Sequence, residues 1–266
     1  ALSSTFSEMK NTYGQRNILV SYGEKINEMN VGLHAFVGSA NRSDRNYTGL
    51  NADYDGFETY DMTDNSALNA VHVNMSVSKD KFKNRLILDQ YNTGIKDGFD
   101  AITSSFNVAY NSLIFSSEYT FDVTDKFSLT PEFIFKKQEP YHNENQNAKD
   151  AFIFYNVLAQ RTTGRFTANY NLSDRVNFIG GLEMYHDQAS ASDSFDYFLP
   201  DNPEDSLQSK VQYMNYAAFA QGLVKTQFVD VLAGLRFEEN SAFGSSFVPR
   251  LALTKAFDKF HFKFLA

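Results

Sequence analysis

The chain has 266 residues, enough for one large domain or two ordinary ones, and its formal net charge of −8 argues against a nucleic-acid-binding protein. It contains no cysteine, which excludes disulfide bonds, thiol nucleophiles and zinc–thiolate centres. Phe and Tyr are abundant (26 and 15 residues), yet the mean hydropathy is only −0.40. No run of about 18 apolar residues is present, which excludes membrane-spanning helices but not membrane-spanning β-strands, whose lipid-facing residues alternate with polar ones.

A period of two recurs along the chain. Apolar residues alternate with polar or small ones over 30–37 and 71–78, and the same pattern returns at 165–172 and 260–264. A helix would instead place apolar residues three and four positions apart. The sequence therefore predicts an all-β fold.

Two kinds of connection alternate between the expected strands. Short hairpin turns, most of them with Asp, Asn or Ser beside Lys or Arg, are expected around Asn27, 79–81, 122–126, 172–175, 225–228 and 257–259. The other connections are mostly longer and rich in polar and aromatic residues: 41–66, 95–105, 140–159 and 189–209, with brief ones at 13–14 and 240–245.

This division gives about thirteen strands, many of which are long. Strands of soluble sandwiches usually have about 5–6 residues, whereas a strand that crosses a bilayer needs about 9–11. Short turns on one side and long loops on the other are typical of outer-membrane barrels. The pattern therefore favours an antiparallel transmembrane β-barrel.

Several segments resemble TonB-dependent outer-membrane receptors. Residues 11–23 are similar to the first barrel hairpin of that family, and 216–221, 232–238 and 246–253 resemble its consecutive mid-barrel strands. The resemblance implies that 1–266 is a TonB-dependent receptor-like β-barrel domain, the N-terminal and middle part of a barrel, with about 13 of an expected 22 strands. We expect the plug domain and the C-terminal strands to lie outside this sequence.

The resemblance also implies a function. Such a receptor takes up a scarce nutrient, such as an iron chelate, haem, cobalamin or a glycan, across the outer membrane of a Gram-negative bacterium with TonB-coupled energy. The expected partners are outer-membrane lipid, the plug domain and the TonB system reached through the parent chain, and the small-molecule nutrient. Two alternatives remain open: a passive porin-like channel, and a soluble β-rich binding module.

No enzymatic chemistry is predicted. The histidines lie on separate segments without the i, i+4 spacing of a helical zinc motif, and no phosphate-binding loop or nucleophile elbow is present. We therefore expect no catalytic residue, no cofactor and no metal site. The five histidines of the sequence are His34, His72, His142, His186 and His261.

Two sets of residues are candidate binding sites. Aromatic residues of the long connections could form a ligand-binding surface, with packing within the loops as the alternative: Tyr47, Tyr54, Phe57, Tyr60, Tyr197 and Phe198. Arg236, Glu238 and Arg250 are expected to face the lumen and the plug, with ion pairs to neighbouring strands as the alternative. Gly180 and Gly181, within an expected strand, suggest a kink.

Overall fold

The computed structural model describes all residues except 10–12, 44, 52–55, 64–65, 96–105, 144–155, 193–209 and 258–259. Its regular elements in the described part of the chain are all β-strands, arranged as one sheet of fourteen strands and one of two. Within the same residues, no helix is long and apolar enough to span a membrane. The all-β, antiparallel fold predicted from the sequence is confirmed.

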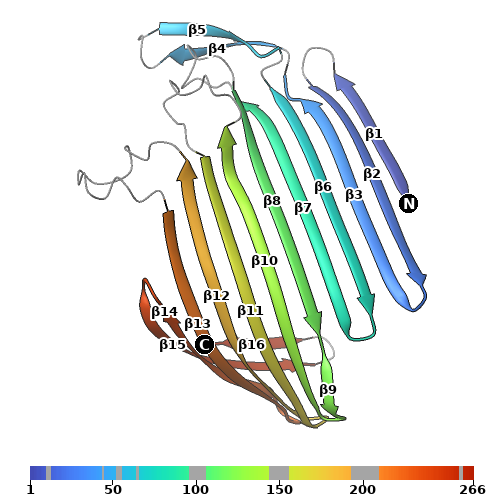
Figure 1. Cartoon of the computed structure of the whole chain (residues 1–266), viewed down its shortest axis with the longest axis vertical. Helices are drawn as coiled ribbons and strands as arrows, with labels where there is room; N and C mark the ends of the chain where they lie inside the picture. The colour runs from blue at the N-terminus through green and yellow to red at the C-terminus, as the bar shows by residue number, and fades with distance from the viewer. Residues whose placement is uncertain are drawn as a thin grey trace.

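The large sheet is an up-and-down meander in which neighbouring strands are antiparallel (Figure 1). One strand, β9 (Phe121–Thr124), lies off the main path and pairs only with β10. The other strands, in spatial order, are β1 (Leu2–Met9), β2 (Tyr13–Ile26), β3 (Met29–Asn41), β6 (Ala67–Lys79), β7 (Phe82–Ile95), β8 (Phe106–Tyr119), β10 (Phe127–Asn143), β11 (Asn156–Ser173), β12 (Val176–Ser192), β13 (Lys210–Lys225), β14 (Asp230–Asn240), β15 (Gly244–Ala256) and β16 (His261–Leu265). Among the described pairings, β1 and β16 are the two edges of the sheet.

The hairpin turns lie where the sequence predicts them and gather at one end of the sheet, which we call the turn end (Figure 1). In two of them the backbone has positive φ angles: 47° at Asn27, 68° at Glu28 and 51° at Asp80. Asn and Asp tolerate this left-handed conformation better than most residues, and two-residue hairpins need it to match the strand twist. The strands that enter the long connections end at the opposite, loop end.

One long connection contains structure that the sequence analysis missed. Within 41–66, β4 (Asn46–Asn51) and β5 (Gly56–Asp61) form the separate two-stranded sheet, with Thr48 Oγ1 and Thr59 Oγ1 2.8 Å apart. The base of this hairpin is tied to the large sheet. Buried Ser66 donates to the carbonyl oxygen of Ser43 (2.6 Å), and Arg42 Nη2 donates to that of Gly94 (2.6 Å).

Two expected loops are shorter than predicted, because β10, β11 and β12 extend further toward the loop end. In β10 the register shifts between Gln138 and Tyr141 on one side and between Glu139 and His142 on the other. Pro140 lies in this bulge, where its missing N–H costs no ladder hydrogen bond. The sequence analysis ended the strand at this proline, whereas the chain continues past it.

The sheet has two chemically distinct faces. In β14, residues 233, 235, 237 and 239 are exposed and 234, 236, 238 and 240 are half-buried. The register extends this alternation across the sheet, because Phe237 lies opposite Ala218 and Arg236 lies opposite Phe219. We call the face that carries Phe166, Leu182 and Phe237 the apolar face, and the face that carries Arg165, Glu183 and Arg236 the polar face.

Candidate functional site

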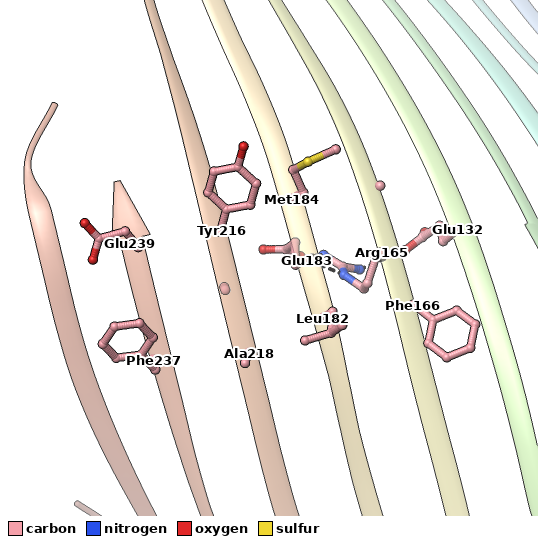
Figure 2. Close-up of a pocket in the computed structure, with 12 residues that line it drawn as sticks. Glu132, Arg165, Phe166, Leu182, Glu183, Met184, Tyr216, Ala218, Phe237 and Glu239 are labelled. Carbon is pink, nitrogen blue, oxygen red and sulfur yellow. Dashed lines mark hydrogen bonds and ion pairs between the residues drawn. The ribbon is translucent and has the colours of Figure 1, made fainter. Parts of the chain in front are cut away.

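An ion-pair network lies on the polar face and begins on β10, β11 and β12. Arg165 lies directly opposite Glu132 on one side and Glu183 on the other. Its guanidinium donates to Glu183 Oε2 through Nε (2.7 Å) and Nη2 (2.6 Å), and to Glu132 Oε2 through Nη1 (2.9 Å). Figure 2 shows Arg165 between the two carboxylates. One guanidinium therefore joins three neighbouring strands by charge-assisted hydrogen bonds.

The network reaches β14 across the intervening strand β13. Arg236 Nη2 donates to Glu183 Oε1 (2.7 Å), and its Nε donates to Glu238. Glu183 thus binds one arginine with each carboxylate oxygen, and its side chain is only 10% exposed. The network contains three carboxylates and two guanidinium groups, so most of its charge is compensated internally.

A glycine on β12, Gly181, makes room for an aromatic ring that lies beside this network. The guanidinium of Arg236 lies 5.9 Å from the centre of the Phe219 ring, on β13. A Cβ at Gly181 would lie 2.7 Å from Cζ of Phe219 and would overlap the carbonyl oxygen of Phe166. The strand is in regular register through Gly180 and Gly181 on both sides, so it has no β-bulge there. At Gly181, the missing side chain admits an aromatic ring.

The three lumen candidates from the sequence lie together. Arg236 and Arg250 line the same hollow of about 300 Å³ on the sheet, with Glu183, Phe219 and others. Arg236 and Glu238 pair with each other, and Arg236 also pairs with Glu183 two strands away. Arg236 therefore forms a cross-strand ion pair as in the alternative interpretation, whereas Glu238 pairs with Arg236 on its own strand. Glu132, Arg165 and Glu183 were missed, because only the strand register brings them to Arg236.

A second cluster lies on the same face, nearer the loop end. Arg161 forms a two-pronged pair with Asp187, with both N–O distances 2.6 Å, and its guanidinium lies 4.2 Å from the centre of the Tyr185 ring. On the next strand, the Tyr213 and Phe243 rings are 5.8 Å apart, with Phe243 in the turn after β14. This part of the polar face offers aromatic rings and a fixed guanidinium, groups that bind aromatic or anionic ligands.

The apolar face carries a depression of about 530 Å³ across β11 to β14 (Figure 2). Its larger side chains are Phe166, Leu182, Met184, Tyr216 and Phe237. Leu182 is 63% exposed and Phe237 47% exposed, although both are fully apolar. Large exposed apolar surfaces mark places where a protein contacts something other than water.

Only part of the predicted aromatic surface can be placed. Tyr47 and Phe57 lie on the β4–β5 hairpin and are exposed (60% and 79%), and the register puts Tyr60 opposite Tyr47. The other three candidates, Tyr54, Tyr197 and Phe198, lie outside the described residues. A role of these aromatic residues in ligand binding remains a prediction.

Comparison with known proteins gives a fold but no close relative. No protein-family model and no curated protein matches the sequence. The structure is similar to that of the ferric enterobactin receptor PfeA from Pseudomonas aeruginosa, with a TM-score of 0.69 and 12% identity over 97% of this chain and 41% of that one. It is also similar to the siderophore receptor PirA from Acinetobacter baumannii, with a TM-score of 0.59 and 14% identity over 98% of this chain and 41% of that one.

PirA from Pseudomonas aeruginosa gives a TM-score of 0.58 at 10% identity, covering 98% of this chain and 40% of that one. The chain thus spans about two fifths of the length of these receptors. Its fold is that of part of the β-barrel of siderophore receptors.

Proposed function

We propose that this chain, over residues 1–266, forms part of the barrel wall of a TonB-dependent receptor in the outer membrane of a Gram-negative bacterium, and that the receptor takes up an iron chelate. The observation that carries this proposal is the pair of opposed faces on strands of membrane-crossing length. Strands β2, β3, β11 and β14 have 14, 13, 18 and 11 residues, at or above the roughly 9–11 that a tilted strand needs to cross a bilayer. The fold shared with siderophore receptors supports the same proposal.

The apolar face is the one that would contact lipid. Toward the turn end it carries an aromatic band, with the Tyr119 and Phe121 rings 4.5 Å apart and the Phe127 and Tyr170 rings 6.4 Å apart. Aromatic girdles mark the two membrane–water interfaces of outer-membrane barrels. The band would therefore lie at the periplasmic interface, since short turns are periplasmic in such barrels.

The polar face would line the lumen, where a plug domain of the same parent chain packs. Arg250 is exposed beside the half-buried network of Glu183 and Arg236, and the hollow between them could receive a plug side chain. We assign Arg236, Glu238 and Arg250 to this plug-facing wall. The wall nearer the loop end, with Arg161 and Tyr185, would face the incoming chelate together with the hairpin aromatics Tyr47, Phe57 and Tyr60.

The test compares a deletion strain with one that carries the complete receptor. We expect the receptor to fractionate with the outer membrane and to restore uptake of ⁵⁵Fe-labelled siderophores under iron limitation. Uptake should stop when tonB is deleted. Uptake that persists without TonB would identify a passive porin-like channel, and recovery of the protein from the soluble fraction without detergent would identify a soluble binding module.

A further inference from the structure

Two histidines that are far apart in the sequence meet on the polar face. His34 lies on β3 and His72 on β6, and these strands pair directly although 25 residues of connection separate their ends in the sequence. His34 lies opposite Asn74 and His72 lies opposite Phe36, so the two histidines are diagonal neighbours. Their ring centres are 6.4 Å apart, with the ring planes at 69°.

Each imidazole is held by a second polar group. Ser21 Oγ on β2 lies 2.8 Å from Nδ1 of His34, and Asp89 Oδ1 on β7 lies 3.4 Å from Nδ1 of His72. A histidine that binds a metal through one ring nitrogen commonly has its other nitrogen fixed by a carboxylate or a similar partner. Both Nδ1 atoms have such a partner; in the tautomer in which Nδ1–H donates to it, each Nε2 carries the lone pair that binds a metal.

We propose that His34 and His72 form a two-histidine site for a divalent transition-metal cation of the imidazole-binding class (Cu²⁺, Ni²⁺ or Zn²⁺), oriented by Ser21 and Asp89. A metal about 2.0–2.1 Å from one nitrogen of each ring lies about 3.2 Å from each ring centre, so rings up to about 6.4 Å apart can share it. The observed separation of 6.4 Å equals this limit, at which the metal lies on the line between the two ring centres; a bent N–metal–N angle requires side-chain rotation that brings the rings closer together. Water completes the coordination.

The histidine pair is accessible to a metal ion in solution. The His72 side chain is 36% exposed and Asp89 60% exposed, so an aqueous ion can reach the pair. Asn74, opposite His34, accepts a hydrogen bond from Arg85 (3.0 Å), so its oxygen is already engaged. Among the described residues, no group of three or more acidic and histidine side chains is placed to hold a metal ion, so the site depends on the two imidazoles. A bound metal would link β3 to β6, the two strands that the connection with the β4–β5 hairpin joins.

The site is independent of the cargo, and its test does not require uptake. The complete receptor is purified with a tag that lacks histidine, and Cu²⁺ is titrated because imidazole sites bind it most tightly among the first-row divalent ions. We expect a Cu²⁺-binding step with nitrogen hyperfine structure from two imidazoles in the electron paramagnetic resonance spectrum. Millimolar Mg²⁺ should not compete, because it prefers oxygen ligands.

The variants separate the two ligands from their orienting partners. His34→Gln or His72→Gln should weaken Cu²⁺ binding more than tenfold and remove the two-imidazole spectrum, whereas Asp89→Asn should weaken binding by about 10–100-fold and keep the spectrum. His261→Gln is the matched control, since His261 lies on the same face but opposite Ala256. Heat-modifiable gel migration verifies that each variant is folded. Wild-type Cu²⁺ affinity in both folded ligand variants, or an equal loss in His261→Gln, would overturn the site.

Discussion

Three consecutive residues of β12 show how differently the two faces are built. Leu182 and Met184 on the apolar face are 63% and 47% exposed, whereas the carboxylate between them, Glu183, has a side chain only 10% exposed. A soluble protein places such residues the other way round. The charged residue is enclosed by its arginine partners and the apolar ones are largely exposed, so the surface that needs a non-aqueous neighbour is the apolar face of the sheet.

The largest effect is expected from a charge on the apolar face. Leu182→Arg, in the middle part of β12, should lower the free energy of unfolding in lipid vesicles by about 2–4 kcal/mol, the cost of arginine at the bilayer midplane. Asn169→Arg on the polar face of the adjacent strand is the control: it loses the hydrogen bond from Asn177 but places no charge on the apolar face, so its cost should stay well below that of Leu182→Arg. Urea unfolding of both variants measures the difference. Equal costs would show that the apolar face does not contact lipid.

A methyl group on the polar face is expected to have the next largest effect. Gly181→Ala would press a Cβ against a backbone oxygen that cannot easily move, and we expect a loss of about 1–3 kcal/mol from overpacking. The control is Gly164→Ala on the apolar face of β11, where a Cβ has no heavy atom within 4 Å. The same unfolding measurement applies, and a neutral Gly181→Ala would mean that the Phe219 ring does not pack over this glycine.

Neutralising the centre of the ion-pair network should cost less. Glu183→Gln keeps the shape but removes the charge that both Arg165 and Arg236 bind, while Glu132 and Glu238 still compensate the arginines. We expect a loss of about 1–2 kcal/mol, since hydrogen bonds to charged groups contribute about 1.5–3 kcal/mol and this network is partly solvated. Glu239→Gln, exposed on the apolar face, should be nearly neutral. If both variants are neutral, the network adds no stability.

The smallest effect tests how the loss of unfolding free energy caused by a charged residue changes with its depth in the membrane. Leu253 lies on the apolar face near the turn end, opposite Val231 and Phe264, whereas Thr254 lies opposite Asp230 and Lys263. Leu253→Arg should cost about 0–1 kcal/mol near the interface, and Thr254→Arg even less in folding. Refolding midpoints in urea compare the two. A larger cost for Thr254→Arg would mean that the register of β15 is wrong by one residue.

The sequence predicts most of the large sheet because the alternation of apolar and polar residues, sustained over a strand long enough to cross a bilayer, is a local pattern. Val71, Val73 and Met75 identify one face of β6 without any knowledge of its neighbours, and Asp80 identifies the following turn. The β4–β5 hairpin was missed because its strands are short and polar, without a repeating apolar face. Alternation also cannot say where a strand ends beyond the apolar band, so the continuation of β10 past Pro140 was missed too.

The candidate site was only partly predictable for a different reason. Arg236 and Glu238 stand two residues apart in one strand, so their shared face is visible in the sequence. Glu183 is 53 residues away from Arg236, and the contact exists only because β13 between them carries the small residue Ala217 and the Phe219 ring on the same face. His34 and His72 are hidden in the same way. Their proximity depends on the pairing of β3 with β6 across a long connection.

The anchored base of the β4–β5 hairpin has a consequence for engineering. The hairpin satisfies its own backbone hydrogen bonds as a separate sheet, while Ser66, Ser43 and Arg42 fix its base to the rim of the large sheet. We therefore expect that the segment between 46 and 61 can be exchanged without altering the pairing of β3 with β6. We expect it to accept a foreign hairpin, at the expense of any ligand contact made by Tyr47, Phe57 and Tyr60, while the strands that carry it keep their pairing.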